Sequence, residues 1–141
     1  MSKIGAIVIV EDDPDDQEVL TEALTELGIE NDLVFFEKSF EAFHYLKTTT
    51  QQPFIILSDV NLPGQNGVEF KRRIDLDPQL RSKSIPFIFY STSAEKHAVD
   101  IAFRELTVQG FFLKSPFYTE LKNNLKLIID YWKISKHPNS M

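Results

Sequence analysis

Five short apolar segments, separated by longer amphipathic stretches, constrain the fold of this chain more than any other feature. The segments are residues 4–10, 33–36, 54–58, 86–90 and 111–113. In the stretches between them, apolar residues recur three or four positions apart, which is the spacing of one helix face. Strands that alternate with helix-length segments are typical of a parallel sheet covered by helices. We therefore predict an α/β fold.

The stretches between the strands carry helix signals. We predict helices over residues 14–27, 39–47, 68–76, 95–105 and 117–134. In the first of them, Asp13 can cap the start, Pro14 suits the first turn and Gly28 suits the end. The strand at 54–58 contains four consecutive apolar residues, which is typical of a strand covered by helices on both faces. We expect it to be central in the sheet.

The chain has 141 residues, of which 43% are hydrophobic, and this length suits one domain. We expect that domain to span residues 1–141, with its core at about 4–134 and a frayed tail at 135–141. The net charge of −6, without a Lys/Arg run, argues against a nucleic-acid surface. The absence of cysteine excludes disulfides and thiolate chemistry. No stretch reaches the ~18 apolar residues of a membrane span, so a cytoplasmic location is expected.

Polar side chains follow four of the five predicted strands, at the point where each strand ends. Glu11 and Asp12 follow the first strand, Asp59 the third, Ser91 the fourth and Lys114 the fifth. The carboxyl ends of parallel strands meet at one edge of the sheet, where such folds bind their ligands. We therefore expect these five residues to form one site.

The chemistry of these residue types indicates phosphoryl transfer. Three carboxylates brought together raise one another's pKa unless a cation lies among them, and hard oxygen ligands favour Mg²⁺. Lys114 offers a positive charge to a phosphoryl oxygen, and the Ser91 hydroxyl can donate to another. Among these groups Asp59 is the candidate nucleophile, because it is central and adjacent to the metal.

The order of these motifs resembles that of response-regulator receiver domains. Residues 59–67 read Asp-Val-Asn-Leu-Pro-Gly-Gln-Asn-Gly, which is similar to the phospho-acceptor loop of that family. Residues 7–14, 85–93 and 111–114 are similar to its other three motifs, in the same order, and the resemblance extends over about residues 4–132. It implies a three-layer, doubly wound (βα)5 receiver fold with parallel strands in the order 2-1-3-4-5.

The resemblance also assigns roles to residues. It implies that Asp59 accepts a phosphoryl group from a sensor histidine kinase or a phosphotransfer protein. Mg²⁺ would be bound by Asp12, Asp59 and the backbone carbonyl of Asn61, with Glu11 acting mainly through water. The signal would then pass to a downstream protein target through protein contacts.

Three further positions follow from the same resemblance. Lys114 would bind the Asp59 carboxylate or the phosphoryl oxygen, Ser91 would move inward to the phosphoryl group, and Phe111 would be the switch aromatic that follows it. Most members of the family have proline directly after the lysine, whereas Ser115 stands there in this chain. The Lys-Ser pair, Asn61 and the aromatic pair at 131–132 resemble single-domain regulators that are paired with bacterial phytochromes.

Two alternatives remain beside this interpretation. One is a pseudo-receiver, a binding module that works without phosphorylation. The other is a phosphohydrolase of the haloacid-dehalogenase type, which needs a second carboxylate two residues after its nucleophile, where this chain has Asn61. We expect no enzyme activity beyond slow, Mg²⁺-dependent self-phosphorylation and autodephosphorylation, with Asn61, Thr92 and Ser93 placed to influence the attacking water.

Two other features have a functional and a structural interpretation. Asp13, Asp15 and Asp16 suit the N-terminus of the first helix, where acids are favoured, and we predict that role for them. On the last helix, Leu127, Tyr131 and Ile134 form either the margin of one wide buried stripe or a second stripe. A second, exposed stripe would be a homodimer or partner surface.

Overall fold

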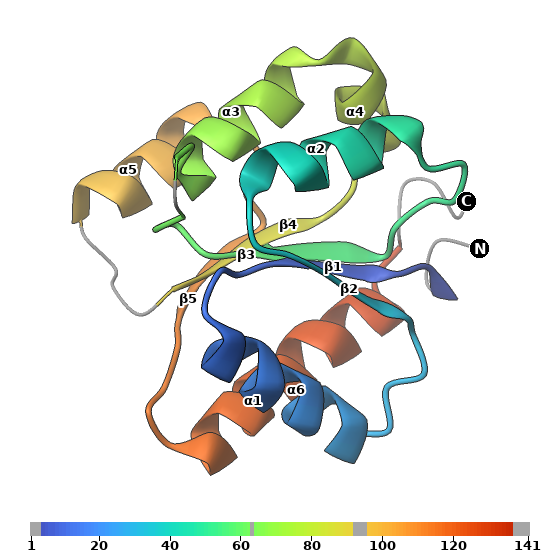
Figure 1. Ribbon diagram of the computed structural model, residues 1–141, viewed down its shortest axis with the longest axis vertical. Helices are drawn as coiled ribbons and strands as arrows, with labels where there is room; N and C mark the ends of the chain where they lie inside the picture. The colour runs from blue at the N-terminus through green and yellow to red at the C-terminus, as the bar shows by residue number, and fades with distance from the viewer. Residues whose placement is uncertain (1–3, 63, 92–95, 137–141) are drawn as a thin grey trace.

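The five apolar segments form a single parallel sheet in the computed structural model, which describes residues 4–62, 64–91 and 96–136 (Figure 1). The strands are β1 (Ile7–Val10), β2 (Leu33–Phe36), β3 (Ile55–Ser58), β4 (Phe87–Ser91) and β5 (Gly110–Leu113). Their order is β2-β1-β3-β4-β5, and every neighbouring pair is parallel. This confirms the predicted fold class and strand order.

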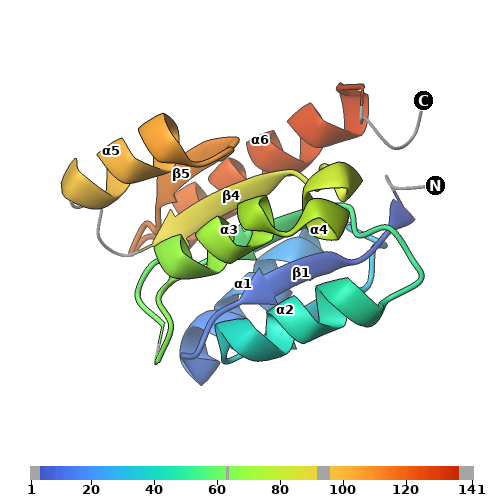
Figure 2. The ribbon, with the colours of Figure 1, turned by 90° about the horizontal axis from the view of Figure 1, so that it is seen from above.

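Helices cover both faces of the sheet (Figures 1 and 2). They are α1 (Pro14–Glu26), α2 (Ser39–Thr48), α3 (Gly67–Leu76), α4 (Pro78–Lys83), α5 (Lys96–Glu105) and α6 (Tyr118–Ile134). Helices α1 and α6 lie on one face, and the other four lie on the opposite face. As predicted, Asp13 caps α1, because its side chain accepts a hydrogen bond from the Asp15 amide.

The short helix α4 was not among the predicted helices, although its sequence signals are clear. Asp77 caps it by accepting a hydrogen bond from the Leu80 amide, and Pro78 occupies the first turn. Ser84 ends it in the left-handed conformation, with φ of 50°. Only one residue separates α4 from α3. Apolar spacing alone therefore predicts a helix followed by a loop in this region.

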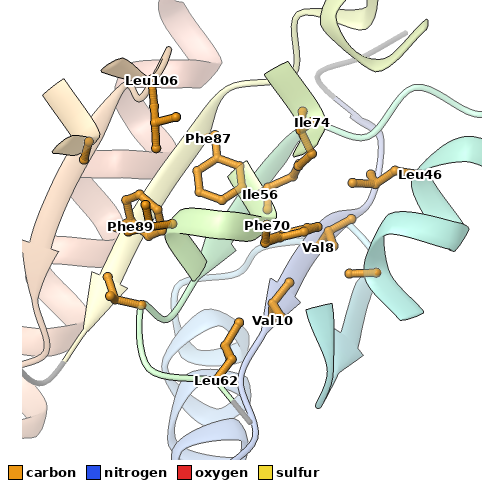
Figure 3. Close-up of a cluster of buried hydrophobic side chains, with 14 of the residues drawn as sticks. Val8, Val10, Leu46, Ile56, Leu62, Phe70, Ile74, Phe87, Phe89 and Leu106 are labelled. Carbon is orange, nitrogen blue, oxygen red and sulfur yellow. The ribbon is translucent and has the colours of Figure 1, made fainter. Parts of the chain in front are cut away.

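The core consists of two apolar layers, one on each side of the sheet. In β1, Val8 and Val10 point into the layer under α2, α3, α4 and α5 (Figure 3). Ile7 and Ile9 alternate with them and belong to the layer under α1 and α6. All four residues of β1 and of β3 are buried, which confirms that β3 is a central strand. Each Val, Ile or Leu side chain of these strands contributes about 1.5–3 kcal/mol when it leaves water.

Parallel pairing brings the ends of the strands to one edge. Val10 lies opposite Ser58, and Ser91 lies opposite Leu113, so the residues that follow these strands are neighbours. Backbone hydrogen bonds continue past the strand ends: the Asp59 amide donates to Val10 (3.0 Å) and the Lys114 amide to Ser91 (2.7 Å). The fold therefore fixes both backbones before any side chain contributes.

Two expectations concern the ends and surfaces of the chain. Residues 137–141 of the predicted frayed tail lie outside the described residues. Among the helices of the described part, none has the length and apolar character needed to cross a membrane.

Candidate functional site

Three carboxylates from two strand ends converge at the carboxyl edge of the sheet. Glu11, Asp12 and Asp59 each offer an oxygen, and these oxygens lie within 4.8 Å of one another. Glu11 and Asp59 are buried, whereas Asp12 is exposed. The site is thus buried on one side and exposed to water on the other. Such a set of carboxylate oxygens suits a cation that keeps part of its hydration shell, as Mg²⁺ does. The donor set therefore fits the predicted magnesium site.

Lys114 extends from the end of β5 into this cluster. Its Nζ donates to Glu11, lies 3.1 Å from Asp59 Oδ2 and lies 3.2 Å from Asp16 Oδ2. Burial by itself would lower the pKa of this lysine, but the hydrogen bond to Glu11 and the charges of Glu11 and Asp59 outweigh burial and raise it above the ordinary value. Lys114 is therefore a permanently charged donor in the site.

Glu11 is a buried carboxyl group whose surroundings favour its protonated form. The pKa of Glu11 is raised from an ordinary 4.5 to about 7, because burial and, more weakly, the charge of Asp59 outweigh the lowering effects of the hydrogen bond and charge of Lys114 and of the Asp13 amide. A carboxyl group that holds a proton this readily releases it when a cation binds. The cluster is thus suited to bind a divalent ion with loss of a proton.

The carboxylate of Asp59 has donors on both oxygens. Ser91, which is completely buried, donates from its hydroxyl to Asp59 Oδ1 at 3.0 Å, and the Asn61 amide donates to the same oxygen at 3.1 Å. Lys114 donates to Oδ2. Five predicted site residues, Glu11, Asp12, Asp59, Ser91 and Lys114, are thus brought together. The predicted metal contact of the Asn61 carbonyl stays a prediction.

Phe111, the predicted switch aromatic, lies on β5 and is partly buried. Its ring packs against Phe89 with the centroids 5.5 Å apart, at the margin of the apolar layer under α5. Phe89 belongs to β4, the strand that ends in Ser91. Phe111 is therefore in contact with the strand that carries the hydroxyl, and its switching role stays a prediction.

The loop after Lys114 is fixed by hydrogen bonds at the position where the family resemblance leads one to expect proline. The Lys114 amide donates to the Ser91 carbonyl, and the Ser115 hydroxyl accepts from the Phe117 amide at 3.1 Å. Ser115 thus forms a short turn that leads into α6. Thr92 and Ser93, which were predicted to influence the attacking water, lie outside the described residues.

Two residues, one of them inside the predicted acceptor loop, have roles at the site that were not predicted from the sequence. Gly67 begins α3 so close to the acceptor strand that a Cβ there would lie 2.2 Å from the Asp59 carbonyl oxygen. The Gly67 amide also donates to Val60 at 2.7 Å, so only glycine fits this close approach. Asp16 was predicted to act at the helix N-terminus alone, yet it contacts Lys114.

The spacing of the acids does not identify Asp16 as a site residue. Asp16 follows Asp12 by four positions and lies in the first turn of α1, the helix that starts immediately after the site. Asp12 precedes Asp13, the N-cap of α1, so the rule that residues four apart share one side of a helix does not place Asp16 beside it.

The chain was compared with known proteins. The model of the family described as "Response regulator receiver domain" matches residues 7–126. Among curated proteins, the response regulator Rcp1 of Synechocystis sp. is 30% identical over 131 residues, which cover 89% of this chain and 87% of Rcp1.

Solved structures show the same likeness. The phosphorylated cyanobacterial phytochrome response regulator RcpA has a TM-score of 0.83 and 28% identity, with 94% of this chain and 96% of RcpA covered. The Mn²⁺-bound form of Rcp1 has a TM-score of 0.79 and 28% identity, with the same two coverages.

Proposed function

The chain belongs to the family of response regulator receiver domains, which serve two-component signalling, and from this premise we propose that Asp59 accepts a phosphoryl group. The donor is a sensor histidine kinase or a phosphotransfer protein. One observation carries the proposal: two different donors, Ser91 and Lys114, bind the two oxygens of the buried Asp59 carboxylate. A phosphoryl group on either oxygen would find both donors within reach.

The reaction is an exchange of one bond to phosphorus for another. An Asp59 carboxylate oxygen attacks the phosphorus of a phosphohistidine, the P–N bond breaks, and the imidazole nitrogen leaves with the bond's electron pair while an acyl phosphate forms. Asp12, Asp59 and the Asn61 carbonyl would hold Mg²⁺, with Glu11 acting through water, and the ion would supply charge neutralisation. Lys114 and Ser91 then exchange their bonds to Asp59 for bonds to phosphoryl oxygens.

Phosphorylation would change the structure around Ser91, one of the two donors to Asp59. Ser91 ends β4, whose Phe89 packs on Phe111, so an inward movement of Ser91 changes the packing next to Phe111. We propose that a downstream protein reads this change through contacts on the surface, because packed cores respond in discrete steps.

The last helix offers one such surface. Leu121, Leu125, Ile128 and Ile129 face the core, whereas Leu127, Tyr131 and Ile134 are exposed. The alternative of one wide buried stripe is therefore wrong within this chain. The second stripe, formed by Leu127, Tyr131 and Ile134, is exposed. We propose that it binds a second copy or a partner. Sedimentation that finds only monomer at high concentration would remove the homodimer.

The likeness to RcpA and Rcp1 supports a narrower partner class. RcpA is a cyanobacterial phytochrome response regulator, and its structure aligns with 94% of this chain at 28% sequence identity. We propose that the kinase of this chain is also of the phytochrome class. Phosphotransfer from a panel of purified histidine kinases, with and without a phytochrome sensor, tests this point.

A single experiment tests the acceptor role. The protein is incubated with Mg²⁺ and acetyl phosphate, its intact mass is recorded, and the Asp59→Asn variant is treated in parallel. We expect an adduct of one phosphoryl group in the wild type and none in the variant. Absence of both the adduct and beryllofluoride binding would instead identify a pseudo-receiver, and rapid turnover of phosphate esters would identify a hydrolase.

A further inference from the structure

Asp16 contacts the site lysine but stands apart from the metal-binding carboxylates. Its Oδ2 lies 3.2 Å from Lys114 Nζ, and among the described residues the group that can hold a metal consists of Glu11, Asp12 and Asp59. The Lys114 side chain is only 6% exposed, whereas that of Asp16 is 36% exposed. Asp16 thus closes the water-facing side of a buried ammonium.

The ammonium of Lys114 has three hydrogens, and three carboxylates lie around it. They belong to Glu11, Asp59 and Asp16. The inference rests on the proposed function, in which Glu11 and Asp59 turn toward a divalent cation and Asp59 becomes an acyl phosphate. Both carboxylates then share or lose their charge, and Asp16 keeps its own.

Helix α1 holds Asp16 at this place independently of the metal. Asp13 caps the helix directly before the turn that contains Asp16, and Gln17 donates from its side chain to the Glu11 carbonyl at 2.6 Å. The backbone of Asp16 is therefore tied on both sides to the strand end that carries Glu11. The backbone position of Asp16 therefore depends on these contacts and on no metal ligand.

We propose that Asp16 is a positioning residue that keeps the Lys114 ammonium aimed at the phosphoryl group once Glu11 and Asp59 are engaged. Asp16 touches neither the phosphoryl group nor the metal, and it acts through Lys114 alone. Without it, the long lysine side chain would gain freedom toward solvent at the step in which it must bind a phosphoryl oxygen.

The competing explanation is a general effect of negative charge at a helix N-terminus. Asp15 provides the matched control, because it is the same residue type in the same first turn of α1 and is not among the carboxylates that contact Lys114 in the described part of the chain. Any effect of helix charge or of net charge near the metal appears equally in Asp15→Asn and Asp16→Asn.

The first measurement is the affinity for beryllofluoride, a phosphoryl mimic, at saturating Mg²⁺. We expect Asp16→Asn to weaken it about three- to tenfold, the range for one partly exposed charge-assisted hydrogen bond, and Asp15→Asn to weaken it less than about twofold. The affinity for Mg²⁺ alone should change equally in both variants, and Asp16→Glu should recover most of the loss. Equal beryllofluoride losses in the two variants would overturn the proposal.

The second measurement observes Lys114 directly. NMR on protein with isotope-labelled lysine follows the hydrogen exchange of the Lys114 ammonium with Mg²⁺ bound. We expect exchange to become about fivefold faster in Asp16→Asn and to stay unchanged in Asp15→Asn. An unchanged rate in Asp16→Asn would overturn the proposal. If the wild type binds no beryllofluoride, the proposed function fails, whereas this measurement still decides the role of Asp16.

Discussion

The side chains of Lys71 and Lys114 are both almost completely buried, yet they lie at opposite edges of the sheet. Lys114 follows the carboxyl end of β5. Lys71, on α3, lies 5.2 Å from the ring of Phe87, the first residue of β4, and donates to Thr107, which precedes β5. Burial lowers the pKa of Lys71 because its hydrogen bond to Asp75 offsets only part of the cost, whereas the carboxylates around Lys114 raise its pKa.

The difference lies in the balance of charge. Among the described residues, Lys71 has one carboxylate partner, Asp75, at 2.8 Å, and the pair neutralises itself. Lys114 has three carboxylates, which leave a surplus of negative charge that attracts a cation. A buried lysine with one partner is therefore a structural element of the fold, whereas a buried lysine among several acids marks a site that is incomplete without a further positive charge.

The largest expected effect separates the two lysines by function. Lys114→Met should weaken beryllofluoride binding at saturating Mg²⁺ by about a hundredfold, because a charged hydrogen bond worth roughly 1.5–3 kcal/mol is lost together with neutralisation of the phosphoryl charge. Lys71→Met, its matched control, should stay within about threefold of the wild type. The two affinities are measured by titration under the same conditions, and similar losses would contradict the comparison.

The second prediction concerns the free energy of unfolding, which should depend strongly on the Lys71–Asp75 pair although beryllofluoride binding does not. Asp75→Asn leaves the Lys71 ammonium buried without its carboxylate and should lower the free energy of unfolding by about 2–4 kcal/mol. Lys71→Met should cost less, since an apolar chain of similar size suits the position. Urea unfolding measures both. Asp130→Asn, which breaks the exposed pair with Lys126, is the control and should change stability by less than about 0.5 kcal/mol.

The same contrast explains what the sequence could predict. Glu11, Asp59 and Lys114 were predictable because strand ends of a parallel sheet share one edge, which topology alone determines. Asp16 was not, since a helical acid looks the same whether or not a lysine from the fifth strand reaches it. Lys71 carried no distinctive signal either, because a Lys–Asp pair four residues apart is also common on exposed helix faces, and its other partner, Thr107, is distant in the sequence.

Local geometry accounts for the other differences. Gly67 is required by the 2.2 Å that would separate a Cβ from the Asp59 carbonyl oxygen, and no spacing rule reports such an approach. Helix α4 was missed although Asp77 and Pro78 signal it, because its six residues are too short to show an apolar period. The pattern of apolar residues thus predicts layers and edges, and contacts between distant segments decide the rest.

A smaller effect, on pH dependence, should appear at the Lys114 edge alone. The pKa of Glu11 is raised from 4.5 to about 7, so its proton competes with the cation below neutral pH. Mg²⁺ affinity should therefore rise about tenfold from about pH 6 to about pH 8. Calorimetric titration in buffers of different ionisation enthalpy measures the affinity and the released proton.

The control for this pH effect is Glu11→Gln, which should remove most of the slope. The sign for stability is the opposite of that for Mg²⁺ binding. Because the folded-state pKa of Glu11 is raised, its contribution to metal-free stability is present below 4.5 and is lost as the pH rises through about 7. The contradicting outcome is a free energy of unfolding that, in the metal-free wild type, rises between pH 4.5 and about 7 while that of Glu11→Gln stays constant. It would show that burial does not raise the pKa of Glu11.

The smallest expected effect compares one hydroxyl at each edge. Thr107→Val removes the hydroxyl that donates to Asp75 at 2.7 Å and accepts from Lys71 at 2.9 Å, while the Thr107 amide keeps its bond to Asp75. The ion pair survives, so the loss of unfolding free energy should be about 1 kcal/mol, with beryllofluoride affinity unchanged. Ser91→Ala also removes one hydroxyl that donates to a carboxylate, and it should cost a similar free energy but weaken beryllofluoride binding about tenfold. Urea unfolding and the same beryllofluoride titration measure both variants. Equal losses of beryllofluoride affinity in Thr107→Val and Ser91→Ala would contradict the comparison. They would mean that the Lys71–Asp75 pair is energetically coupled to Asp59, because only such coupling could transmit the loss at Thr107 to the site.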